Sequence, residues 1–168
     1  MLKNYFSTAH IARAGIICSL YIVISLVCAP ISSGAVQVRL SEALSILAII
    51  FPEAVPALFI GCALSNMITG CAPYDVIFGS VVTLIAGTCS FFCAKIIKNV
   101  PLKIIVGGFF PIVLNAFILP LIWQWCYGFI EYVYMVQVGI LAIGQSVSVY
   151  LVGTPLYFVA VKIKNKMN

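Results

Sequence analysis

Charged residues are scarce in this sequence. Its 168 residues include nine Lys or Arg and four Asp or Glu, so that 8% of the chain is charged, whereas a soluble domain carries about 25%. So few charges cannot cover a water-exposed surface, and so apolar a chain does not have the composition of a disordered segment. The composition therefore excludes a soluble globular enzyme, a disordered protein and a nucleic-acid-binding module.

The usual catalytic and metal-binding patterns are also missing. The sequence has one histidine, no G-x-x-x-x-G-K-[ST] phosphate loop, no H-E-x-x-H zinc motif and no G-x-S-x-G nucleophile motif. We therefore expect no enzyme activity, no metal site and no cofactor. The seven cysteines form no C-x-x-C pair, and we expect them to be small packing residues. One disulfide among Cys28, Cys71 and Cys126 stays open as an alternative.

Long apolar stretches are what the chain does contain. Hydrophobic residues make up 64% of it, and its mean hydropathy is +1.20. Uncharged stretches cover residues 14–38, 54–74, 76–94, 104–130 and 132–161, and each is long enough for a helix through the ~30 Å hydrocarbon core of a bilayer. A shorter apolar stretch at 43–52 has two interpretations, a further crossing or a re-entrant segment.

The basic residues decide between these two interpretations. Basic clusters mark the cytoplasmic side of a membrane protein, so both termini and the 95–103 loop are expected there. An even number of crossings is then needed before residue 95, which makes 40–51 a crossing. Eight of the nine basic residues lie in these clusters, at Lys3 and Arg13, at Lys95, Lys98 and Lys103, and at Lys162, Lys164 and Lys166.

We therefore predict one all-α integral membrane domain over residues 1–168, with six transmembrane helices and both termini in the cytoplasm. The helices are expected near residues 12–29, 40–51, 54–70, 75–94, 103–125 and 132–161.

This topology gathers polar side chains toward the outer leaflet. A charge within a span costs about 2.5–3.5 kcal/mol, so such a residue usually faces the bundle interior or a wet cavity. We interpret the set as a small-molecule pocket open to the outside, where carboxylates accept hydrogen bonds and aromatic rings stack on a planar ligand. The candidates are Arg39, Glu42, Asn66, Asp75, Trp123 and Trp125 near the outer helix ends, and Asn115 and Gln145 deeper in the bundle.

Each candidate also has a purely structural interpretation. Arg39 and Glu42 are three residues apart and could form an interfacial ion pair. Asp75 could cap a helix, and the tryptophans fit an aromatic belt. Asn115 and Gln145 could bond one helix to another.

The first expected helix carries small residues that pair at a spacing of four, namely Ala14, Gly15, Cys18 and Ser19. Small side chains at this spacing let a second helix approach closely. That helix could belong to this chain, which is the default, or to a partner protein.

Two parts of the sequence resemble the QueT family. Residues 36–44 (VQVRLSEAL) are followed by Pro52 and by residues 56–61 (PALFIG), and Asn66 is followed by residues 74–84 (YDVIFGSVVTL). The R-x-S-E-A-L pattern combined with D-x-x-x-G-S-x-x-T-L is the most specific part, and the resemblance covers nearly the whole chain. QueT proteins are queuosine-precursor transporters, the substrate-binding S components of energy-coupling-factor (ECF) importers.

The resemblance implies a fold, a location and partners. An S component is a six-helix bundle of the bacterial plasma (cytoplasmic) membrane, with its termini inside and a pocket toward the outer face. It has no ATPase activity and works with a membrane scaffold, the T component, and two ATPase subunits. By this resemblance, the scaffold contact would involve Ala14, Gly15, Cys18 and Ser19.

The resemblance also implies a ligand, a 7-deazaguanine such as queuine or its aminomethyl or cyano precursor. Carboxylates accept hydrogen bonds from the N–H groups at the edges of bases. Gln145 stands where the family pattern often has Glu after Gly144, so the exact substrate stays open. The residues matched to roles are Glu42 or Asp75 for the N–H groups, Asn115 and Gln145 for the carbonyl and amine, Trp123 or Trp125 for stacking, and Arg39 for orienting Glu42.

Three other hypotheses are compatible with the sequence. The first is an S component for another vitamin-like compound, which the Gln145 departure favours. The second is a stand-alone facilitator or channel, which would need no partner. The third is a membrane enzyme, for which the four acids and one histidine leave little acid–base material.

Overall fold

The computed structural model describes residues 7–32, 39–128 and 132–167 of the chain, and every regular element in these ranges is helical, with no strand. The all-α prediction is confirmed. In chain order the elements are α1 (Thr8–Val27), α2 (Ala29–Ser32), the 3₁₀ helix η2 (Leu40–Ile49), α3 (Ala54–Ile68), the π-helical turn η3 (Asp75–Gly79), α4 (Ser80–Ile96), α5 (Val100–Tyr127), α6 (Tyr134–Ser146), the π-helical segment η4 (Val147–Val152) and α7 (Gly153–Met167).

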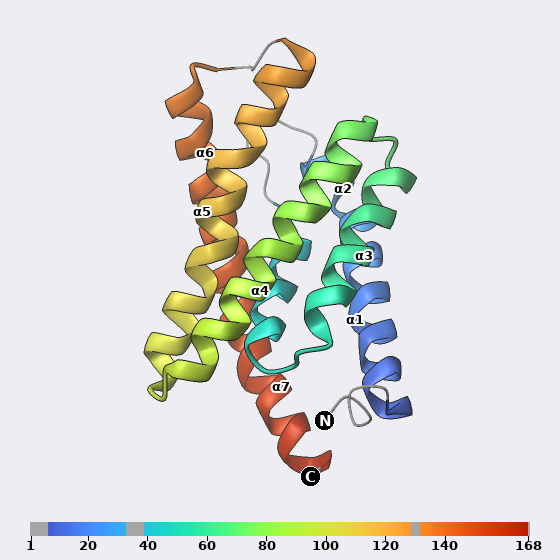
Figure 1. The fold of residues 1–168 in the computed structure, drawn as a ribbon, viewed down its shortest axis with the longest axis vertical. Coiled ribbons are helices and arrows are strands. Elements are labelled where there is room, and N and C mark those ends of the chain that lie inside the picture. Colours follow the sequence, from blue (N-terminus) through green and yellow to red (C-terminus); the bar gives the residue numbers. More distant parts are fainter. Residues whose placement is uncertain (1–6, 33–38, 129–131, 168) are drawn as a thin grey trace.

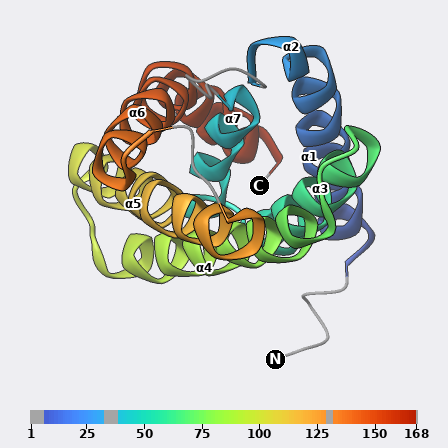
Figure 2. The same ribbon diagram turned by 90° about the horizontal axis from the view of Figure 1, so that it is seen from above.

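The longer helices form a ring around η2. Neighbours along the ring are α1 with α3, α3 with α4, α4 with α5, and α5 with α6, while η2 packs against α1, α3, α4, α5, η4 and α7. Viewed from above, η2 lies inside the ring (Figure 2). The start of α1, the C-terminal part of α7 and the connection between α4 and α5 lie at the same end of the bundle, referred to as the end with the termini (Figure 1).

The central position of η2 follows from its composition. Every residue from 41 to 51 is buried, and most of the segment is aliphatic. A 3₁₀ helix rises about 2.0 Å per residue, so the ten residues of η2 cover roughly 20 Å, against roughly 15 Å for an α-helix of the same length. The 3₁₀ conformation therefore stretches a short apolar segment, but to less than the ~30 Å hydrocarbon core.

Four helical segments are long and apolar enough to cross a membrane, by length and composition. They are Thr8–Val27, Asp75–Ile96, Val100–Tyr127 and Tyr134–Lys166, and the segments Leu40–Ile49 and Ala54–Ile68 are shorter apolar helices. The expected elements at 40–51 and 54–70 thus exist as helices, but their length does not by itself make them crossings.

Two helix boundaries differ from the expectation for physical reasons. The helix expected at 103–125 runs over Val100–Tyr127, because the Asn99 side chain accepts a hydrogen bond from the Leu102 backbone N–H at its start. It ends at Gly128, which has φ of 74° in the left-handed region that favours glycine. The helix expected at 132–161 is interrupted by the π-helical segment η4, and α7 continues beyond residue 161.

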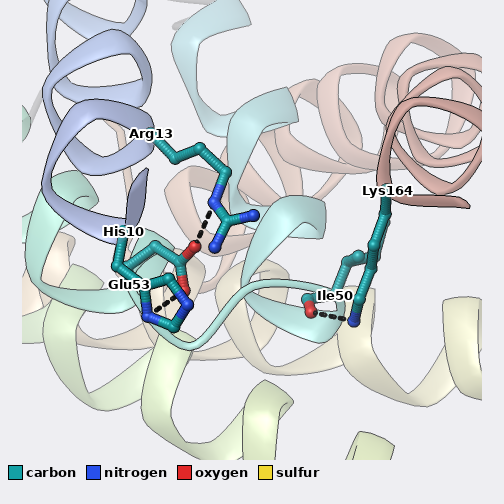
Figure 3. A network of polar contacts seen from close by, with 5 residues as sticks. All are labelled: His10, Arg13, Ile50, Glu53 and Lys164. Carbon is teal, nitrogen blue, oxygen red and sulfur yellow. Dashed lines mark hydrogen bonds and ion pairs between the residues drawn. The ribbon is translucent and has the colours of Figure 1, made fainter. Parts of the chain in front are cut away.

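The end of the bundle that holds the termini is closed by charged side chains (Figure 3). Arg13 on α1 pairs with Glu53 through Nε and Oε1 at 2.6 Å, and His10 Nδ1 lies 4.0 Å from Glu53 Oε2. Lys164 on α7 donates from Nζ to the backbone oxygen of Ile50 at 3.1 Å. The turn after η2 is therefore tied to both α1 and α7.

Close packing of α5 against η4 leaves no room for a side chain at Gly108. A Cβ added there would lie 2.6 Å from Tyr150 Cε1 and 2.9 Å from Val149 Cγ1, whereas one added at Gly139 on α6 meets nothing within 4 Å. We expect Gly108→Ala to lower the free energy of unfolding by about 1–3 kcal/mol through overpacking. Gly139→Ala should leave it unchanged or raise it by up to about 1 kcal/mol. Reversible unfolding in mixed micelles measures both, and equal values would contradict the packing described.

Candidate functional site

A cavity of about 230 Å³ opens at the end of the bundle opposite the termini. Its walls come from the C-terminal parts of α1, α3 and α5 and from the starts of η2 and η3, which meet at that end (Figure 1). The lining residues are Ser25, Ala29, Arg39, Ser41, Ser65, Asn66, Thr69, Cys71, Asp75, Gly79, Leu119 and Trp123. Four of the sequence-predicted site residues, Arg39, Asn66, Asp75 and Trp123, are thus brought together.

Asn66 joins two of these residues. Its Oδ1 accepts a hydrogen bond from Arg39 Nη2 at 3.2 Å, and its Nδ2 donates to the backbone oxygen of Asp75 at 3.1 Å. The ion pair expected between Arg39 and Glu42 is absent from the described part of the chain, where the ion pairs are those of Glu53. The three-residue spacing suits an α-helix, but Arg39 lies before η2 in a non-helical conformation and reaches α3 instead.

Asp75 connects the start of η3 to the end of α5. Its Oδ1 accepts from Trp123 Nε1 at 2.8 Å and its Oδ2 accepts from Tyr127 Oη at 3.0 Å. The alternative role as a helix cap is not observed, because both carboxylate oxygens bond to α5 side chains. Asp75 therefore holds Trp123 in place at the cavity wall, and both of its oxygens already have a donor.

The two tryptophans lie in different surroundings. Trp123 lines the cavity, whereas Trp125 is 89% exposed and does not line it. Residues two apart on an α-helix point about 200° apart, so only one of them can face the bundle. Trp123 is therefore the candidate for the expected stacking role, and Trp125 fits the aromatic-belt interpretation.

Glu42 lies at the start of η2, next to the cavity-lining Ser41. Its side chain is fully buried, and its Oε1 accepts a hydrogen bond from Tyr21 Oη at 2.8 Å. Its Oε2 is buried and has no hydrogen-bond partner among the described residues. Tyr21 was not among the sequence candidates, although a tyrosine in the middle of an apolar helix signals a polar partner in the bundle.

The amides of Asn115 and Gln145 are buried and unpaired. Their exposed fractions are 1% and 0%, and neither the oxygen nor the nitrogen of either amide has a hydrogen-bond partner in the ranges that the structure describes. The alternative of hydrogen bonding between helices is therefore not observed. Neither residue lines the open cavity, and Gln137, which the sequence analysis did not select, is buried in the same way at its Oε1.

The small residues of α1 divide into two pairs. Ala14 and Cys18 pack against the hydrophobic core, and a Cβ added to Gly61 of α3 would lie 3.3 Å from the Cys18 backbone oxygen. Gly15 and Ser19 are exposed, and a Cβ added to Gly15 meets nothing within 4 Å. Internal packing thus uses one pair and leaves the other on the outer surface.

No group of three His, Cys, Asp or Glu side chains comes together within the described residues. All seven cysteines are free thiols, so the disulfide alternative is not observed.

The bonds of Asp75 to α5 generate a prediction about Trp123. In a Trp125→Phe background, Asp75→Ala removes both acceptors, and we expect a red-shifted Trp123 emission that is more easily quenched by iodide. Loss of two hydrogen bonds to a charged group should also lower stability by about 2–5 kcal/mol. Asp75→Asn keeps one acceptor and should give an intermediate spectrum. Fluorescence of the purified chain measures this, and an unchanged Asp75→Ala spectrum would contradict the geometry.

Comparison with known proteins identifies the family of this chain. The family model described as QueT transporter matches residues 11–162, which is nearly the whole chain. No match is found among curated proteins or among solved structures. The predicted family membership is confirmed. With its family and its several long apolar helices, this chain belongs to the QueT transporter family and is a multi-pass membrane transporter protein.

Proposed function

We propose that this protein is the substrate-binding S component of an ECF importer in the bacterial plasma membrane, and that it takes up a queuosine precursor. The observation that carries the proposal is a small cavity, lined by Arg39, Asn66, Asp75 and Trp123, at the end of the bundle opposite the termini. Such a site can hold a small polar ring by hydrogen bonding and stacking.

The charge distribution supports an outward orientation of the cavity. The 95–103 loop and the C-terminal end of α7 lie at the end of the bundle away from the cavity (Figure 1), and both are basic. The positive-inside rule places that end in the cytoplasm, so the cavity faces outward. In this arrangement η2 and α3 supply the two remaining crossings of a six-helix bundle, with η2 shielded from lipid by its neighbours.

The polar groups suit a 7-deazaguanine. The buried and unpartnered Oε2 of Glu42 can accept an N–H from the guanine-type edge. Asp75 is the less suitable acceptor, because each of its oxygens already accepts a hydrogen bond from an α5 side chain, and it acts by holding Trp123 for stacking. The cavity volume of about 230 Å³ is below the roughly 300–1,000 Å³ usual for drug-sized ligands, which favours a compact ring system.

Energy for uptake comes from partners under this proposal. The sequence has no phosphate-binding loop, so ATP hydrolysis is assigned to two ATPase subunits that act through a scaffold T component. The alternatives are an S component for another vitamin-like compound and a stand-alone facilitator. The first shares the fold and differs in ligand, and the second would transport without partners.

Ligand binding by the purified chain tests the substrate. We expect tight binding of queuine or of the aminomethyl or cyano deazaguanine, no ATP requirement, and no binding of riboflavin. Glu42→Gln should weaken the binding by about 10- to 100-fold, since hydrogen bonds to charged groups contribute about 1.5–3 kcal/mol. Isothermal titration measures the affinity. Glu53→Gln is the matched control, because it makes the same change at the opposite end of the bundle and should leave affinity unchanged.

Three outcomes would overturn parts of this proposal. Folded protein that binds no deazaguanine rules out the ligand, and tight binding of a different vitamin-like compound supports the first alternative. Flux into liposomes that contain this chain alone supports the facilitator.

The exposed small residues of α1 generate a separate prediction about the scaffold. We expect Gly15→Leu combined with Ser19→Leu to abolish co-purification with the T component, since bulky side chains block close helix approach. Ligand binding should survive, because both positions are exposed. Gly139→Leu, at an equally open position on α6, is the control. Retention of the T component by the double variant would rule out this contact face.

A further inference from the structure

Four buried polar side chains that do not line the open cavity each have at least one side-chain atom without a hydrogen-bond partner in the described part of the chain. Glu42, Asn115, Gln137 and Gln145 are 0%, 1%, 3% and 0% exposed. Six of their side-chain atoms are both buried and unpartnered among the described residues. Buried polar groups in folded proteins are nearly always paired, so a group of unpaired ones calls for a water or a ligand.

Asn115 and Glu42 each adjoin residues that line the cavity. Trp123, Leu119 and Asn115 succeed one another at intervals of four along α5, which places them on one face of the helix. Trp123 and Leu119 line the cavity, so Asn115 lies one turn deeper. On η2, Ser41 lines the cavity and Glu42 is the next residue. Leu119 is 2% exposed and lies between Trp123 and Asn115 along this face of α5.

Gln137 and Gln145 lie on α6, the helix that packs against α5. α6 packs against α5, and η4 packs against both α5 and η2. Tyr134 Oη donates to the Phe117 backbone oxygen at 2.9 Å, and Tyr150 Oη donates to that of Ile105 at 2.8 Å. Gln137 and Gln145 lie between these two tie points in the chain, so they run alongside the part of α5 that carries Asn115.

The unpartnered atoms are unequal in kind. Four are acceptors, namely Glu42 Oε2, Asn115 Oδ1, Gln137 Oε1 and Gln145 Oε1, and two are donors, the amide nitrogens of Asn115 and Gln145. Glu42 forms no ion pair within the described part of the chain. A ligand edge that satisfies such a set carries more N–H donors than acceptors and is not an anion.

We infer that Glu42, Asn115, Gln137 and Gln145 form an inner tier of the binding site, closed from the outer cavity by Leu119, that binds the donor-rich edge of a neutral or cationic heterocycle. This inference rests on the proposed function, because it assigns the ligand's hydrogen-bonding edge to the inner tier and its stacking face to Trp123. Gln137 is thereby a specificity-determining residue.

Apolar replacements separate a ligand subsite from a structural polar layer. We expect Asn115→Leu, Gln137→Met and Gln145→Met each to weaken 7-deazaguanine binding by at least tenfold. The melting temperature of the ligand-free variants should stay level or rise, because unpaired buried polar groups are removed. Ser90→Ala is the matched control. Ser90 is buried but paired with the Gly107 and Ala86 backbone oxygens, so its loss should lower the melting temperature and leave affinity unchanged.

The closing role of Leu119 has its own readout. Leu119→Ala shortens the side chain between cavity and inner tier, so both the association and the dissociation rate constants should rise. Rate constants equal to those of the unaltered protein would overturn the closure.

Titration and thermal unfolding of the full-length chain with queuine, both deazaguanine precursors, guanine, cytosine and hypoxanthine distinguish the outcomes. If all three tier variants bind the deazaguanine as tightly as the unaltered protein does, the inner tier is overturned and the proposed function stands. If the unaltered protein binds only guanine or cytosine, and the tier variants lose this binding, the proposed ligand is overturned and the tier is supported. If no donor-rich compound shifts the melting temperature of the unaltered protein, the tier is overturned as well.

Discussion

A bilayer gives polar side chains one favourable place away from its surfaces, the interior of a helix bundle, because lipid offers no hydrogen bonds. In this protein the interior is organised by η2, a short helix buried from Ser41 to its end at Ile49 and enclosed by α1, α3, α4, α5 and α7. Glu42 enters the bundle on this helix and is held by Tyr21. Enclosure of η2 therefore places a carboxyl group where no surface residue could hold it.

The two ends of the bundle are stabilised differently. At the end with the termini, Arg13 pairs with Glu53 and Lys164 bonds to the backbone after η2. At the cavity end, Asp75 bonds to α5 aromatic side chains. An unpaired buried polar atom costs about 1–3 kcal/mol, and such atoms lie on η2, α5 and α6 beside the cavity wall. A polar ligand or water bound beside these atoms would offset that cost.

The sequence predicted the all-helical class of the fold, and four of its eight candidate site residues line one cavity. Scarcity of charge and long apolar stretches were sufficient for an all-α membrane protein, and the expected outer ends brought Arg39, Asn66, Asp75 and Trp123 together at one cavity. The 3₁₀ form of η2 was not predictable, because it depends on enclosure by five helices rather than on local preference. The sequence also did not show which of two nearby residues on a helix faces the bundle interior.

Pairings between distant residues were the other missing part. Arg39 bonds to Asn66, 27 positions away, and Asp75 bonds to Tyr127, 52 positions away. No local spacing in the sequence predicts either contact. On α1, a single step along the helix separates Cys18, which packs inward, from the exposed Ser19. A rotation of about 100° per residue makes such assignments depend on the packed bundle.

An outward-facing cavity that holds the substrate leaves Cys71 accessible from outside the cell. Cys71 is exposed and lines the cavity, whereas Cys62 is buried and the other five cysteines are partly covered. The measurement is labelling of Cys71 in intact cells by a membrane-impermeant maleimide, in a variant that keeps this cysteine alone. We expect the reagent to label Cys71 from outside the cell, and we expect queuine to slow this labelling. Labelling only after the membrane is opened, or labelling that no deazaguanine affects, would contradict it.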